Sequence, residues 1–282
     1  MRRVLRRTVM VIALAVAALV LIGWGAVGLR RPALDRDWTP DNARLPEARF
    51  DGSTVTVHDV RNFEWRTVSD YTARWESRRY DLARLESVWF LVVPFGDFRG
   101  PAHTFLSFGF ADQAGGTEYV AVSVELRKEV GETYHPVRGL FREYELAYVV
   151  GDERDLVRLR SNVRGDSVYL YRVQATPDQG RTLFRAMLER ANKLRSAPEF
   201  YNTLTSSCTT NIVDHVNAIA PNPVPFSYKL LLPAFSDELA YDLGLLDRTR
   251  PFAELKREAL INGLALAATD DPAFSARIRA GR

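Results

Sequence analysis

The 282-residue sequence predicts an α+β fold, in which an antiparallel β-sheet packs against helices and one N-terminal transmembrane helix precedes it. Three observations lead to this prediction. An uncharged apolar run occupies residues 8–29, short strand-like runs follow through residue 173, and helical periodicity replaces them after residue 176. Because apolar residues make up 46% of the chain, most of it is expected to fold around a buried core.

Residues 1–31 are expected to form an arginine-rich cytoplasmic tip and a membrane anchor. At about 1.5 Å per residue, the run 8–29 is long enough to cross a hydrocarbon layer of roughly 30 Å. A cleaved signal peptide is the alternative, but its apolar region usually spans only about 7–15 residues. Four arginines precede the run and two follow it, which favours a cytoplasmic N-terminus. The sequence therefore predicts a single-pass protein of the bacterial inner membrane whose soluble domain lies in the periplasm.

Three further regions follow this anchor. Residues 32–53 contain prolines and scattered charges and are expected to be an extended linker. Residues 54–235 are expected to form the catalytic domain. Residues 236–282 are expected to form a C-terminal helical extension of short helices packed at the periphery.

The sequence of residues 54–173 predicts mainly β-strands. Residues 54–60 alternate valine with polar residues, and residues 87–93 form a continuous apolar run typical of a buried strand. Residues 103–110 and 118–127 both alternate and are joined by a glycine-rich turn, which predicts a β-hairpin. Further strand-like runs lie at residues 146–150, 155–159 and 167–173.

Two longer helices are expected in the second half. Residues 178–195 have apolar side chains at helical spacing, and the helix follows Pro177 with Thr176 as its cap. A second helix is expected over residues 208–220, capped by Ser206 or Ser207 and ended by Pro221. Shorter helical pieces are expected around residues 236–246 and 252–264.

The composition argues against several classes of function. Acidic and basic residues, 35 and 38 in number, are interspersed and leave a net charge of only +3, so no nucleic acid partner is expected. No glycine-rich phosphate loop follows a strand, and no group of histidine, cysteine and acidic residues has metal-ligand spacing. We therefore expect neither a cofactor nor a metal.

Cys208 is the single cysteine of the chain and a candidate nucleophile. It falls in the first turn of the second helix, where unpaired N–H groups and the helix dipole favour a thiolate. The backbone around Ser207 and Thr209 is a candidate oxyanion-binding site. The alternative is a buried and inert cysteine, because free cysteine is among the most buried residue types.

A cysteine nucleophile needs a base, and His103 is the best candidate among the four histidines. His215 lies on the same helix, about 10 Å from Cys208 by helix rise, which is beyond direct proton transfer. His58 and His135 are expected at the surface. His103 begins a strand directly after a Gly-Pro pair, where its side chain can stand near the start of a helix.

A third polar group should orient the imidazole. The hairpin partner strand offers Ser123 and Glu125 on one face, with Arg127 beyond, and cross-strand pairing can bring one of them beside His103. The alternative for Glu125 is an exposed or salt-bridged surface carboxylate. Asn202, shortly before the cysteine, is a further supporting candidate, as are Ser123 and Arg127.

Four segments carry a resemblance to a known family: HTFLSFGF, EYVAVSVELRKE, GLFREYELAYVVGDERD and PEFYNTLTSSCTTN. Together they resemble the bacterial DUF4105 domain, also called the Lnb N-terminal periplasmic domain, over roughly residues 61–233. The resemblance implies a circularly permuted papain-like fold, related to NlpC/P60, in which histidine precedes cysteine. It implies Cys208 as nucleophile and His103 as general base, with Glu125 as the orienting candidate. The family often has asparagine directly before the cysteine, where this chain has Ser207.

The resemblance implies a membrane-anchored, thiol-dependent acyltransferase or amidase that acts on lipoprotein or other envelope substrates. The representative of the family is a lipoprotein N-acyltransferase with several membrane helices after its soluble domain, whereas this chain is expected to have one helix before it. Two alternatives stay open: a cell-wall peptide hydrolase of NlpC/P60 type, and a non-catalytic envelope binding or scaffold domain. The expected partners are inner-membrane lipid and a lipoprotein or peptidoglycan substrate; the oligomeric state is left open.

Overall fold

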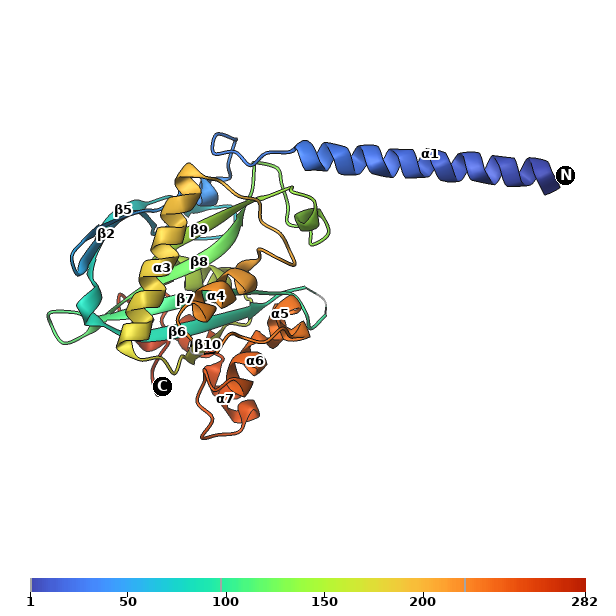
Figure 1. The fold of residues 1–282 in the computed structure, drawn as a ribbon. Coiled ribbons are helices and arrows are strands. Elements are labelled where there is room, and N and C mark those ends of the chain that lie inside the picture. The colour runs from blue at the N-terminus through green and yellow to red at the C-terminus, as the bar shows by residue number, and fades with distance from the viewer. Residues whose placement is uncertain (1, 97, 221) are drawn as a thin grey trace.

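One large mixed β-sheet forms the centre of the molecule in a computed structural model, which describes residues 2–96, 98–220 and 222–282 (Figure 1). Its strands are β1 (Glu47–Asp51), β2 (Thr54–Arg61), β5 (Trp75–Asp81), β6 (Leu85–Pro94), β7 (Ala102–Ala111), β8 (Thr117–Arg127), β9 (Glu145–Gly151) and β10 (Tyr169–Arg172). Within the described residues the strand order is β1-β2-β9-β8-β7-β6-β10, and β5 also pairs with β2. A separate hairpin consists of β3 (Glu64–Trp65) and β4 (Tyr71–Thr72).

The pairing within this sheet is antiparallel except between β2 and β9, which meet in parallel at Arg61 and Gly151. The predicted hairpin is confirmed, because β7 and β8 pair over seven residues from Phe105–Ser123 to Ala111–Thr117. The prediction of an α+β fold is therefore confirmed, and the sheet is mixed rather than purely antiparallel.

Helices cover both faces of the sheet. The helices of the described residues are α1 (Arg2–Leu29), α2 (Glu153–Arg158), α3 (Pro177–Ser196), α4 (Cys208–Asn217), α5 (Tyr228–Leu231), α6 (Ser236–Asp242), α7 (Phe252–Ala259), α8 (Asn262–Ala267) and α9 (Phe274–Arg277). Helix α1 extends away from the sheet (Figure 1). Shorter turns are η1 (Pro40–Asn42), η2 (Leu82–Arg84), η3 (Arg138–Leu140), η4 (Leu159–Arg164) and η5 (Pro233–Phe235). Figure 1 shows α3 and α4 lying across one face of the sheet.

The two predicted helices of the second half are confirmed, and local chemistry explains where they begin. Thr176 accepts a hydrogen bond from the backbone N–H of Gln179, and the Gln179 side chain bonds back to the Thr176 N–H. Ser207 and Thr210 make the same reciprocal capping box at the start of α4. Because each cap satisfies two otherwise unpaired groups, it fixes the first residue of its helix.

The prediction of a strand at residues 155–159 is wrong, because this segment is helical. Asp152 caps α2 by accepting a hydrogen bond from the Arg154 N–H. Leu156 and Val157 are fully buried against one face of the sheet, while Asp155 is fully buried toward Arg61. A short apolar run is compatible with either helix or strand, and tertiary contacts on two sides decide for the helix.

The prediction of an extended linker at residues 32–53 is also wrong. Residues 47–51 form β1, which pairs with β2 along its whole length. Trp38 is buried beneath the Arg127 guanidinium, whose central carbon lies 4.2 Å from the Trp38 ring centroid. The N–H of Thr39 bonds to the Lys128 carbonyl, so this segment packs as part of the domain.

The prediction that residues 236–282 pack at the periphery is wrong as well. Ile261, Phe274 and Ile278 are fully buried in a core cluster with Leu91 and Phe105 of the sheet. Helices α8 and α9 thus cover the face of the sheet opposite to α3 and α4, whereas α6 and α7 pack against the core on the same side as α3 and α4. All four helices belong to the same folded unit.

Helix α1 corresponds to the predicted anchor, but several of its side chains lie outside the described residues. Among the residues that are described, no helix reaches the length and apolarity needed to cross a membrane.

Candidate active site

Cys208 stands at the start of α4, at the floor of a cleft of about 480 Å³ that His103 and Glu125 also line. Cys208 is only 6% exposed, and its Sγ lies 3.9 Å from the carbonyl oxygen of Ala102, the residue before His103. The capping box at Ser207 places the thiol in the first turn of the helix, as the sequence predicts.

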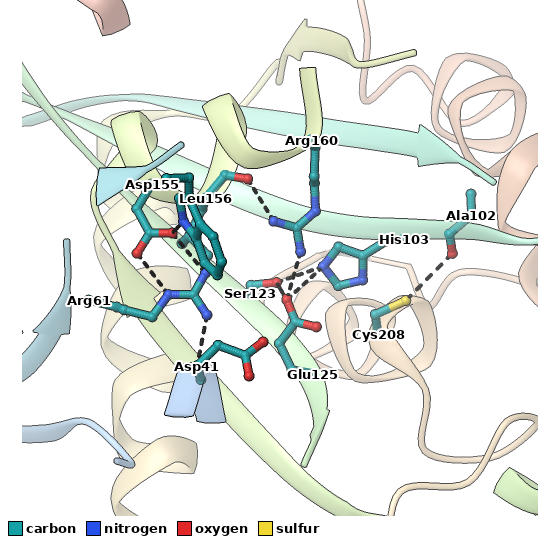
Figure 2. Close-up of polar contacts among 11 residues, drawn as sticks. Asp41, Arg61, Ala102, His103, Ser123, Glu125, Asp155, Leu156, Arg160 and Cys208 are labelled. Carbon is teal, nitrogen blue, oxygen red and sulfur yellow. Dashed lines mark hydrogen bonds and ion pairs between the residues drawn. The ribbon is translucent and has the colours of Figure 1, made fainter. Parts of the chain in front are cut away.

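The His103 ring lies between the thiol of Cys208 and two polar groups of β8 (Figure 2). Its Nε2 is 2.7 Å from Ser123 Oγ and 3.2 Å from Glu125 Oε1. The β7–β8 register explains this meeting, because Phe105 is opposite Ser123. His103 precedes Phe105 by two residues and Glu125 follows Ser123 by two, so alternation brings both onto one face of the sheet.

The charges of these groups support one another. Burial alone would raise the pKa of the Cys208 thiol, but a hydrogen bond with His103, the imidazole charge and the Thr104 donors lower it to about 7. Burial likewise disfavours imidazolium, yet the Glu125 carboxylate raises the pKa of His103 above its ordinary value. Against its own burial, the His103 charge and the neighbouring donors hold the pKa of Glu125 well below its usual range. The site therefore favours a thiolate–imidazolium pair near neutral pH.

Arg160 completes the buried charge cluster, and the sequence analysis missed it. Its Nη2 lies 2.9 Å from Glu125 Oε1, its Nη1 donates to the Leu156 carbonyl at 2.6 Å, and its guanidinium lies over the Phe105 ring at 4.9 Å. Arg160 belongs to η4, a turn with π-helical hydrogen bonding, a geometry often found at functional sites. No spacing in the sequence separates this arginine from its neighbours Arg158 and Arg164, so no local signal could have found it.

The buried pair Arg61–Asp155 holds the helical segment that carries Arg160. Both Asp155 oxygens accept from the Arg61 guanidinium, at 2.8 and 3.0 Å, and they also accept from the Phe63 N–H and the Trp65 indole. A carboxylate with four donors is well compensated for its burial. Figure 2 shows this pair beside the Arg160–Glu125 contact.

Several predicted site residues lie elsewhere or are otherwise engaged. Arg127 donates to the carbonyls of Asn42 and Ala43, away from the thiol. Asn202 accepts from the N–H groups of the next turn and so shapes the loop before α4. The Ser207 hydroxyl caps α4 and the Thr209 hydroxyl bonds to Thr104, so only the backbone of these two residues remains as a candidate for oxyanion binding.

The other histidines do not join the site. His215 Nε2 bonds to the Tyr148 hydroxyl at 2.8 Å, and burial lowers the pKa of His215 to about 4. His58 bonds to Ser77 on a neighbouring strand, and the His135 ring accepts from the Val137 N–H.

The cleft above Cys208 has a largely apolar wall on one side. Side chains from the loop before β7 and from the segment around α5 and η5 form this wall: Phe95, Phe98, Leu231, Leu232 and Pro233. Phe98 is 66% exposed, so the wall continues out to the surface. Lys128 and Asp166 line other parts of the cleft.

Chemically, this arrangement suits covalent catalysis. A thiol of lowered pKa, an imidazole beside it and a carboxylate behind the imidazole can together attack a carbonyl and return a proton to the leaving group. The N-terminus of α4 supplies backbone N–H groups on the thiol side.

Comparison with known proteins identifies the family. No curated protein and no solved structure matches the chain. The family model of the Lnb N-terminal periplasmic domain matches residues 71–234, more than half of the chain and the part that carries His103, Glu125, Arg160 and Cys208. The chain therefore belongs to the Lnb N-terminal periplasmic domain family, whose domain is periplasmic and associated with the cell envelope.

Proposed function

We propose that this chain is a membrane-anchored periplasmic acyltransferase or amidase that acts on lipoprotein or other envelope substrates through Cys208 and His103. The observation that carries the proposal is the position of the His103 ring, which lies between Cys208 on one side and Ser123 and Glu125 on the other and bonds to the two β8 side chains through Nε2 (Figure 2). Its support is electrostatic as well, since the neighbouring His103 lowers the pKa of the thiol to about 7 despite burial.

In the proposed reaction, the Cys208 thiolate attacks the carbonyl carbon of an ester or amide, and a C–S bond forms. The tetrahedral oxyanion is stabilised by backbone N–H groups at the start of α4. The C–O or C–N bond then breaks, and the His103 imidazolium donates its proton to the leaving group. An amine or water attacks the thioester, His103 takes up its proton, and the thiolate leaves.

The apolar wall of the cleft favours an acyl substrate over a polar peptide. Phe95, Phe98 and Leu231 offer exposed apolar surface in the same cleft that Cys208 lines. Such surface gains free energy when it covers hydrocarbon. A cell-wall peptide hydrolase would use the same Cys208 and His103, so the two activities are separated by substrate rather than by residue.

The anchor part of the proposal rests on the uncharged run of residues 8–29 between two groups of arginines. Alkaline carbonate extraction of membranes from the expressing cell checks it. We expect the chain to stay in the membrane pellet at full length, and external protease to digest the domain only after the outer membrane is opened. Release into the soluble fraction at a shortened length would instead support a cleaved signal.

The catalytic part is tested with the full chain in detergent. Because Cys208 is the single cysteine, iodoacetamide labels this thiol alone. We expect alkylation at pH 7 to be faster than that of a model thiol, and we expect acyl transfer or release from a diacylated lipopeptide. Cys208→Ser and His103→Gln should abolish turnover, while His58→Gln, which changes a histidine outside the site, should retain it.

The alternatives predict different outcomes of the same assay. Release of product from muropeptides, with none from the lipopeptide, would support the peptide hydrolase. Slow alkylation together with no turnover of either substrate would support a binding or scaffold domain and overturn the proposed function.

A further inference from the structure

We propose that Arg160 is a positioning residue of this site, which acts through Glu125 and Ser123 to fix the orientation and the tautomer of His103. The proposal rests on the proposed function, because it assigns a role in the same reaction. It concerns a residue that does not touch the thiol.

Three donors converge on one oxygen of Glu125. Ser123 Oγ donates to Oε1 at 2.7 Å, Arg160 Nη2 at 2.9 Å, and His103 Nε2 lies 3.2 Å away. An oxygen that already accepts from Ser123 and Arg160 is fixed in place before the imidazole reaches it. The shortest contact of the imidazole is then with Ser123 rather than with the carboxylate.

The Ser123 hydroxyl thereby determines which ring nitrogen carries a proton. Its single hydrogen is donated to Glu125, so it can only accept from His103 Nε2. The N–H of the neutral imidazole must therefore be at Nε2. The other ring nitrogen, Nδ1, lies on the side of Cys208, where it can receive the thiol proton (Figure 2).

Arg160 is itself held rigidly, as a positioning residue must be. One arm of the guanidinium donates to the Leu156 carbonyl within the same helical segment, and its face covers Phe105. Phe105 also packs against the imidazole: the ring centroids of His103 and Phe105 are 5.4 Å apart, at an interplanar angle of 26°. A shift of Arg160 would thus disturb both the carboxylate and the ring on which the imidazole packs.

The ionised carboxylate of Glu125 is stabilised by His103 and by this arginine. Buried Arg160 is in contact with the partly buried Glu125, and Glu125 is the acceptor that orders both Ser123 and His103. If Glu125 took up a proton, its Oε1 could no longer serve as a charged acceptor for three donors. Arg160 therefore contributes to proton transfer at Cys208 from a distance, through two intervening side chains.

The test is the pH dependence of Cys208 alkylation in the full chain. For wild type we expect the midpoint near pH 7, following the lowered pKa of the thiol. Arg160→Gln should raise the midpoint by about one pH unit, because the loss of the orienting contact outweighs the removal of a cation that by itself lowers the pKa of His103; the alkylation rate at pH 7 then falls about fivefold. Arg160→Lys keeps a cation and should restore most of the shift. Arg154→Gln, an exposed arginine of the same helical segment, is the matched control and should follow wild type.

A double-mutant cycle keeps the proposal testable if Arg160→Gln alone folds poorly, since Arg160→Gln with Glu125→Gln removes both buried charges. If Arg160 acts through Glu125, the double variant should show the same midpoint as Glu125→Gln. An additive shift, or a midpoint in Arg160→Gln equal to that of wild type, would overturn the positioning role. A wild-type midpoint at an ordinary thiol value would instead overturn the proposed function itself.

Discussion

The hydroxyls of Thr104 and Thr209 lie 3.0 Å apart and join β7 to α4, although 105 positions separate the two residues in the chain. Each is the direct neighbour of a candidate catalytic residue, His103 in one strand and Cys208 in one helix. Both threonines are almost completely buried. This contact therefore fixes the register of the helix against the strand at the point where thiol and imidazole meet.

Replacing one of these hydroxyls should destabilise the fold. Thr209→Val keeps the shape of the side chain but leaves the Thr104 hydroxyl buried without this partner, which costs about 1–3 kcal/mol of unfolding free energy. Thr104→Val with Thr209→Val should recover part of that loss, because neither polar group then remains. Urea unfolding of the single and double variants measures the difference, and a double variant less stable than the sum of the singles would contradict this account.

Breaking the Arg61–Asp155 ion pair is expected to cost more unfolding free energy than breaking the Thr104–Thr209 contact. Asp155→Asn leaves the Arg61 guanidinium buried without its counter-charge and should lower the unfolding free energy by about 3–5 kcal/mol. Asp270→Asn is the matched control, because Asp270 is 94% exposed and makes only a long ion pair, of 3.9 Å, with Arg158. This substitution should cost less than about 1 kcal/mol of unfolding free energy. Equal losses in the two variants would show that the buried pair has no special role.

We expect His215 to make the folded state less stable at acid pH. Burial depresses the pKa of His215 from 6.5 to about 4, so the folded state holds its ring neutral. A depressed folded-state pKa gives stability that is present above the unfolded value of 6.5 and lost as pH falls toward 4. The full effect is about 3 kcal/mol. Thermal denaturation between pH 7 and 4 should show a shallower decline for His215→Gln than for wild type; parallel curves would rule out this histidine as the cause.

The N-terminal segment should detach when Arg127 is removed. Arg127→Ala loses two hydrogen bonds to backbone carbonyls and the contact with Trp38, a change of about 1–3 kcal/mol. We expect faster trypsin cleavage at Arg36 and Arg44, followed by mass spectrometry. Arg49→Ala, which removes an exposed arginine of β1, serves as the control, and cleavage at the same rate in both variants would contradict the prediction.

Much of the fold could be predicted from local patterns. The alternation of residues 103–110 and 118–127 with a glycine turn between them predicted the β7–β8 hairpin, whose register the structure supplies. The capped start of α4 put Cys208 in the first turn before any contact was known. Patterns of this kind extend over a few residues, so the chain carries them in its sequence.

Other features could not be predicted, because they depend on how distant layers stack. Residues 155–159 satisfy both helix and strand patterns, and the pairing of Asp155 with Arg61 across 94 positions accompanies the helix. The sequence of residues 32–53 predicts a linker, but in the structure Trp38 packs against Arg127, which is 89 positions away in the chain. The apolar residues of α8 and α9 are expected at the periphery from the sequence, but in the structure they cover the second face of the sheet.

The sequence by itself determined most of the elements, the caps of α3 and α4, the single thiol at a helix start and the family resemblance. Only the tertiary structure decided the surroundings of that thiol. Cys208 comes from the layer of α3 and α4, Arg160 comes from the opposite layer, and His103 comes from the strand between them. The physical reason is that periodicity and capping act within a few residues, whereas a buried charge cluster forms only where packing on both faces of a sheet brings its members together.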